Sequence, residues 1–158
     1  MTARFPHGNR VHRGNVHWCA ERQCNIDLEE LKSLDRFAWN GLVGLIEEAE
    51  GLGVDIDDTL VRSPLIRSPG GMVDPPWLGE FKTVGKAIRG GGARHWRLYF
   101  GEPTNHQDHV VGVRVWHKMS TWSQRVTDER EADAIRKAMK TLKWHFANEG
   151  YEWAKFPT

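Results

Sequence analysis

The chain has 158 residues, 39% of them hydrophobic and 27% charged, with a formal net charge of +1 at pH 7. These values predict one globular domain with its own core, and they exclude a strong overall field that would attract nucleic acid. No apolar run approaches the length of a membrane span. Two cysteines do not make a disulfide scaffold, and residues 1–15 lack the apolar stretch of an export signal, so we expect a cytoplasmic protein.

The first third of the chain predicts a polar arm, a strand and two helices. Residues 1–15 are polar and basic, whereas residues 16–20 alternate apolar and polar side chains as a strand does. A first helix is expected behind an N-cap at Asn25 or Asp27. A second should run from near Asp35 to the glycines at 51 and 53, and the two should pack as a hairpin.

The rest of the domain predicts an irregular loop, three strands and a helix. Residues 54–79 contain four prolines, which favours a long loop. Strand patterns then cover residues 79–88, 94–102 and 109–119, joined by short turns as in an antiparallel meander. A helix capped by Thr127 or Asp128 follows, and residues 150–158 form an aromatic tail. The order predicts an α+β domain over residues 16–149, with helices on one face of a small antiparallel sheet.

Positive charge is concentrated in one segment of this nearly neutral chain. Between Lys82 and Arg125 there are eight Lys or Arg and only two acids. Such a segment indicates a local anion-binding surface. The alternative is that these cations are spread over several faces and solvated. The candidate RNA-binding residues of the segment are Lys82, Lys86, Arg89, Arg94, Arg114, Trp116 and Arg125.

The alternation of side chains along the strands sets the predicted face of each cation. Leu98 and Phe100 mark the core side of residues 94–102, so His95, Arg97 and Tyr99 should face outward. By the same reasoning Lys82, Arg114, Trp116 and Lys118 share that exposed face, whereas His117 points inward. Cations interleaved with aromatic rings can neutralise phosphates and stack bases of single-stranded RNA. The alternative is an outer face whose cations pair with acids of the helices.

Three segments resemble strands of the RelE/HigB-type toxins of bacterial toxin–antitoxin systems. WLGEFK (residues 77–82) is similar to the "GLWELR"-like strand of that family, and HWRLYF (95–100) to its "YRIFY"-like strand. VVGVRVWHKMSTW (110–122) is similar to its "LLHGFVKKSQKT"-like strand and turn, and the resemblance covers residues 16–149. It implies a RelE-like fold. The loop at 54–79, the arm and the tail depart from the compact form of the family.

The resemblance implies cleavage of mRNA on the ribosome, without metal or cofactor, by attack of a ribose 2′-OH on the adjacent phosphate. It also implies an antitoxin as protein partner. Arg97 matches the strand arginine of the family, Lys118 the second of its paired lysines, and His117 replaces the first. These three and Tyr99 are the predicted catalytic residues, and the group that moves the proton is His95, His117, Tyr99 or a lysine. The rival hypothesis is a binding module without catalysis that inhibits a host protein such as gyrase.

Four residues near the N-terminus have the spacing of a possible metal site. They are His12, His17, Cys19 and Cys24. The opposing interpretation is that the cysteines are buried thiols, because no second cysteine pair exists. The prediction therefore assigns no metal.

Overall fold

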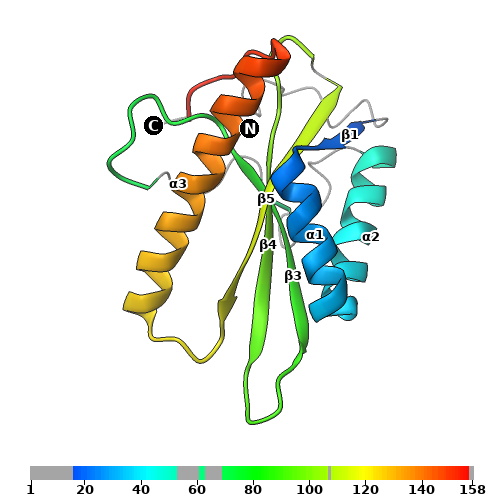
Figure 1. Ribbon diagram of the computed structural model, residues 1–158, viewed down its shortest axis with the longest axis vertical. Helices are drawn as coiled ribbons and strands as arrows, with labels where there is room; N and C mark the ends of the chain where they lie inside the picture. Colours follow the sequence, from blue (N-terminus) through cyan, green and yellow to red (C-terminus); the bar gives the residue numbers. More distant parts are fainter. Residues whose placement is uncertain (1–15, 53–60, 63–68, 107, 157–158) are drawn as a thin grey trace.

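The computed structural model describes residues 16–52, 61–62, 69–106 and 108–156; the predicted arm at 1–15 lies outside them. Three helices and five strands follow one another in these residues (Figure 1). In chain order they are β1 (His17–Ala20), α1 (Arg22–Leu34), α2 (Arg36–Leu52), β2 (Val61–Arg62), β3 (Gly79–Ala87), β4 (Ala93–Gly101), β5 (His109–Met119) and α3 (Gln124–Glu149). No helix in this described part is long and apolar enough to cross a membrane.

The helices begin where a side chain caps them, and two of the predicted caps were wrong. The Glu21 carboxylate accepts a hydrogen bond from the Gln23 N–H at 2.6 Å, so α1 begins before Asn25 and Asp27. Ser123 caps α3 by accepting from the Val126 N–H at 3.3 Å, four residues ahead of the predicted cap.

The sheet has the strand order β1-β5-β4-β3-β2 and is mixed. The β3-β4-β5 meander confirms the predicted three strands. A purely antiparallel sheet was wrong, because β1 pairs with β5 in parallel. The short strand β2, which pairs with β3, lies in the stretch that we expected to be a loop.

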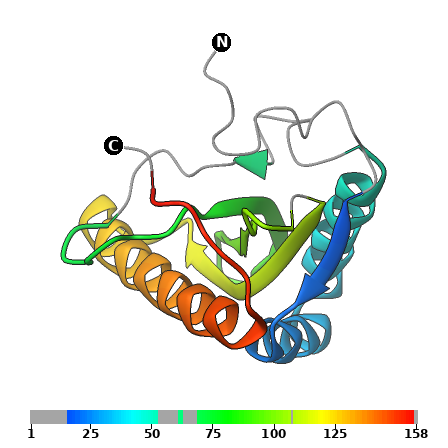
Figure 2. The ribbon, with the colours of Figure 1, turned by 90° about the horizontal axis from the view of Figure 1, so that it is seen from above.

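Helices cover both faces of the sheet, not one as predicted (Figure 2). Leu98 and Phe100 belong to the hydrophobic core under α1 and α2. Tyr99 and Val113 belong to a second core under α3. The central strands are apolar on both faces where they pass between the helices, and such a stretch must be buried on both sides.

The aromatic tail folds back onto the chain. The Trp77 N–H donates to the Ala154 carbonyl at 2.8 Å, and the Phe156 N–H donates to the Pro75 carbonyl at 2.7 Å. The Phe156 side chain is buried in the core under α3. Residues 151–156 therefore extend that core.

Asp35 joins α2 to β3, and its replacement should be costly. Its buried carboxylate accepts from the Ala38 N–H and from the Lys86 N–H, both at 3.0 Å. We expect Asp35→Ala to lower the free energy of unfolding by about 1–3 kcal/mol, because a helix cap is lost and a strand N–H loses its partner. Urea denaturation measures this, with Asp133→Ala as the exposed control. Equal losses of unfolding free energy in both variants would contradict the stabilising role of the two Asp35 hydrogen bonds.

Candidate functional site

The sheet brings four of the basic and imidazole side chains together on the α3 side. Lys82 of β3 lies opposite Arg97 of β4, and His95 of β4 lies opposite Lys118 of β5. Residues directly opposite in neighbouring strands share a face. Arg97 is also opposite Trp116, so this ring lies beside the cations. We call Lys82, His95, Arg97 and Lys118 the basic face.

Two carboxylates already compensate part of this charge. The Arg97 Nε lies 3.9 Å from the Glu80 Oε2, and its Nη1 donates to the Trp96 carbonyl at 3.0 Å. The Lys118 Nζ donates to the Glu131 Oε2 of α3 at 3.1 Å. The side chain of Arg97 is 12% exposed and that of Lys118 is 26% exposed. A phosphate that binds here must therefore compete with Glu80 and Glu131 for the two cations.

His95 is the group of the basic face best suited to accept a proton. Its pKa is lowered below the ordinary 6.5, first by burial and then by the nearby positive charges of Arg97 and Lys118. Near neutral pH the imidazole is therefore uncharged, and a neutral imidazole can take a proton from a hydroxyl group.

The basic face reaches a pocket of about 550 Å³. Three of its residues, Lys82, His95 and Arg97, line this pocket together with residues of α2 that include Asn40 and Glu48. Because α2 packs on the opposite face of the sheet, the pocket extends around the β3 edge. A pocket of this size fits a small ligand or one unit of a chain, and it joins two cations to a neutral base.

Two of the predicted catalytic residues, His117 and Tyr99, do not contribute to the basic face. His117 faces α1 and α2: it lies opposite Trp96, with the two ring centroids 4.6 Å apart. Burial and the charge of Arg94 lower its pKa. Tyr99 has the side of the sheet that we predicted, but its expected exposure was wrong, because α3 buries it completely. Neither residue presents a proton-transfer group on the basic face.

Tyr99 should tolerate loss of its hydroxyl group. Its Oη is buried and has no hydrogen-bond partner among the described residues, and burial raises its pKa well above 10. We expect Tyr99→Phe to equal the wild type in stability or exceed it by about 1 kcal/mol, since an unsatisfied polar atom is removed. RNA binding should not change. Thermal unfolding measures the stability and an RNA-binding assay measures the affinity. A large loss of RNA affinity would show that the Tyr99 hydroxyl group contributes to the site.

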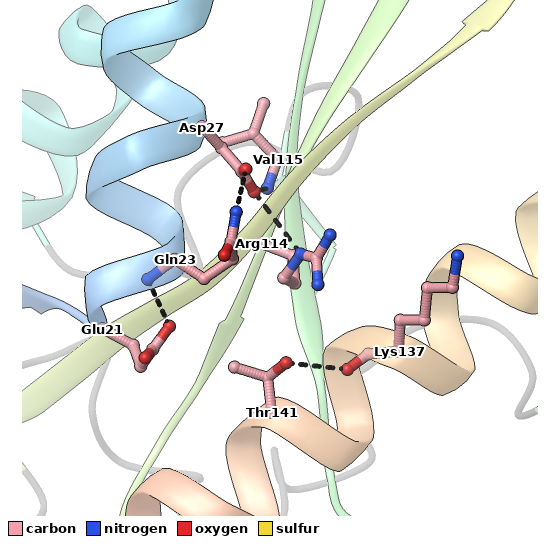
Figure 3. Close-up of polar contacts among 7 residues, drawn as sticks. All are labelled: Glu21, Gln23, Asp27, Arg114, Val115, Lys137 and Thr141. Atoms are coloured by element: carbon pink, nitrogen blue, oxygen red, sulfur yellow. Dashed lines mark hydrogen bonds and ion pairs between the residues drawn. The ribbon is translucent and has the colours of Figure 1, made fainter.

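The other predicted RNA-binding cations point to several faces, as the alternative interpretation held. Lys86 and Arg94 line a separate pocket beside the start of α2. Arg89 is exposed near the β3–β4 turn, and Arg125 pairs with Glu129 on α3 at 3.2 Å. Arg114 lies between α1 and α3, with its Nε 3.5 Å from the Asp27 Oδ2 (Figure 3).

The possible N-terminal metal ligands do not converge. Cys24 belongs to the core under α1 and α2, whereas Cys19 packs against the core on the opposite face. The His17 ring contacts the His109 ring at a tilt, with centroids 4.7 Å apart. His12 lies outside the described residues. Across residues 16–52, 61–62, 69–106 and 108–156 no group of three His, Cys, Asp or Glu side chains could hold a metal ion.

No protein-family model, curated protein or solved structure matches this chain. The resemblance to RelE/HigB-type toxins therefore stays a prediction.

Proposed function

We propose that this protein binds single-stranded RNA on the basic face and cleaves it there without a metal ion. The observation that carries the proposal is the position of His95 beside Arg97 and opposite Lys118 on one sheet face, where His95 and Arg97 also line a pocket. Burial and the two nearby charges lower the pKa of His95. The sequence resemblance supports the cellular form of this activity: cleavage of mRNA on the ribosome by a toxin that an antitoxin restrains.

The proposed reaction is an in-line transfer within the RNA strand. His95 accepts the proton of a ribose 2′-OH, and the 2′-oxygen bonds to the adjacent phosphorus. Arg97 and Lys118 stabilise the negative charge that develops on the phosphorane. The bond to the 5′-oxygen then breaks, and that oxygen takes a proton from the Lys118 ammonium group. The products are a 2′,3′-cyclic phosphate and a 5′-hydroxyl end, and Lys82 holds a flanking phosphate.

The ion pairs of the basic face favour a second candidate function. Because Glu80 and Glu131 lie beside Arg97 and Lys118, these cations have partners without RNA. A binding module that inhibits a host protein needs only such a surface and no proton transfer.

Expression in bacterial cells separates the two candidates. Wild type should arrest growth and create new RNA 5′ ends in translated regions, and Arg97→Ala/Lys118→Ala should do neither. The matched control is Arg125→Ala/Arg136→Ala, which removes two cations of α3 outside the basic face. Growth arrest without new 5′ ends would favour the binding module, whereas soluble protein with no effect would contradict both functions in that host.

The pKa of His95 should depend on its two cationic neighbours. In an NMR titration of the folded protein, we expect its midpoint below 6.5 and an upward shift in Arg97→Gln, where one cause of the lowering is removed. The neutral form exists above this pKa, so cleavage should fall as the pH drops through it. An unshifted midpoint in Arg97→Gln would contradict the electrostatic coupling.

A further inference from the structure

A second pocket lies at the opposite edge of the sheet, between β5 and α3. It measures about 350 Å³. Beyond Gly112 no strand of the described residues pairs with the outer edge of β5, because β1 pairs with residues 109–112. The pocket is lined by Arg114, Val115, Trp116, His117, Trp122, Arg130, Asp133, Ala134 and Lys137. We call it the β5–α3 groove.

Three aromatic rings form one wall of the β5–α3 groove. Trp116 lies on the α3 side, Trp122 comes from the turn after β5, and His117, which packs on Trp96 on the other face, borders the groove at the edge of β5. The Trp122 ring centroid lies 6.3 Å from that of Trp116 and 6.5 Å from that of His117. All three side chains are only partly buried. A guanidinium also stacks here, since the Arg130 Cζ lies 4.5 Å from the centre of the Trp122 ring. Aromatic rings and arginine planes are the groups on which proteins stack nucleobases.

Positive charge dominates the rest of the groove. Arg114 reaches it from β5, and the exposed Lys137 reaches it from α3 (Figure 3). Among the described residues Asp133 is the one acid of the lining, and its carboxylate pairs with Arg136 at 2.9 Å. Arg114 itself pairs with Asp27 at 3.5 Å, which fixes its guanidinium between the two helices.

We propose that the β5–α3 groove binds a nucleotide, with its base against Trp116 and Trp122 and its phosphate at Arg114 and Lys137. The tryptophan rings offer a surface on which a planar base can stack, and the nearby cations can neutralise the phosphate of the same nucleotide. The volume is at the lower end of ligand pockets and suits one nucleotide. The inference does not depend on RNA cleavage at the basic face. The nucleotide is either free in solution or one unit of a single-stranded RNA.

Titration of AMP, followed by saturation transfer to its base protons in NMR, tests the proposal. Ribose 5-phosphate is the matched probe without a base. We expect AMP to bind at least about fivefold more tightly than ribose 5-phosphate, the lower end of what one stacked base contributes. Trp122→Ala should remove this preference and Trp122→Phe should keep most of it. Trp144→Ala, which removes a 67% exposed tryptophan elsewhere on α3, should leave it unchanged.

An oligoribonucleotide of seven residues distinguishes the two sources of the nucleotide. If RNA binds more tightly than AMP and loses affinity in Trp122→Ala, the groove holds one unit of a strand. If AMP binds as tightly as the oligomer, the groove serves the free nucleotide. Equal affinity for AMP and ribose 5-phosphate, or an unchanged preference in folded Trp122→Ala, would overturn the proposal. Because Arg97→Ala/Lys118→Ala removes no residue that lines this groove, failure of the cleavage proposal would not remove AMP binding.

Discussion

Replacing His95 with alanine should lower the single-turnover rate of RNA cleavage by about 10²–10⁴-fold, the usual contribution of a positioned general base. The imidazole lies on the same face as Arg97 and Lys118, and burial together with their charges lowers its pKa. Without it, water must take the proton of the 2′-OH. RNA affinity should change little, because the cations that hold phosphate remain.

The control for this prediction is His145→Ala, which removes a partly exposed histidine of α3 that contacts Tyr151 edge-on with centroids 6.4 Å apart. It should cleave at the wild-type rate. The measurement uses saturating enzyme and purified ribosomes carrying a defined mRNA. If His117→Ala abolished cleavage while His95→Ala did not, the assignment of the base would be wrong, since these side chains lie on opposite faces of the sheet.

Leu142→Ala should lower the free energy of unfolding by about 2–5 kcal/mol, the range for a large buried aliphatic side chain. Leu142 has no exposed surface and lies in the core that docks α3 onto the sheet. Its side chain also covers Gly101 of β4. A Cβ at Gly101 would overlap Leu142 and lie 2.9 Å from the Phe146 Cζ.

A double-mutant cycle sharpens this prediction. Gly101→Ala alone should be destabilising, because the added methyl group pushes against α3. In the Leu142→Ala background the same change should cost less, since one of the two obstructing side chains is gone. Urea denaturation of the four proteins gives the coupling energy. Additive losses would contradict the direct contact between these positions.

The β3-β4-β5 meander could be predicted from the sequence because its signals are local. The period of two persists through each strand, and glycines mark the turn between β3 and β4. Gly90, Gly91 and Gly92 have φ values of 99°, 115° and 81°, a region that other residues rarely adopt. The register that follows placed Lys82, Arg97 and Lys118 on one face correctly.

The layers could not be predicted from alternation alone. A strand with apolar residues on both faces can lie between two helical layers. Alternation alone predicts that the Tyr99 side chain is exposed, whereas in the structure α3 covers it. The β5 register also shifts between Tyr99 and Phe100 of β4. Such a bulge changes which way side chains point: Val111 and Val113 lie in the core under α3, whereas Val115 packs against the core under α1 and α2.

The catalytic candidates show the same limit. Alternation of side chains predicted that His117 points into the core, and in the structure it packs on Trp96. His117 was included among the catalytic candidates because of the family resemblance. His95 is distinguished by its neighbours in space, Arg97 and Lys118, and no motif marks it. Trp122 and Arg130 were missed because they come from a turn and a helix. The only sequence signal for them is an aromatic residue followed by arginines at helical spacing.

Cleavage of an mRNA with one 2′-deoxynucleotide at the mapped cleavage position tests the central claim most directly. We expect the all-ribose mRNA to be cut there to a 2′,3′-cyclic phosphate. The deoxy mRNA should not be cut at that position, because the attacking hydroxyl group is missing. Equal cleavage of both, or cleavage that requires an added divalent metal ion, would contradict attack by the 2′-OH with His95 as the base.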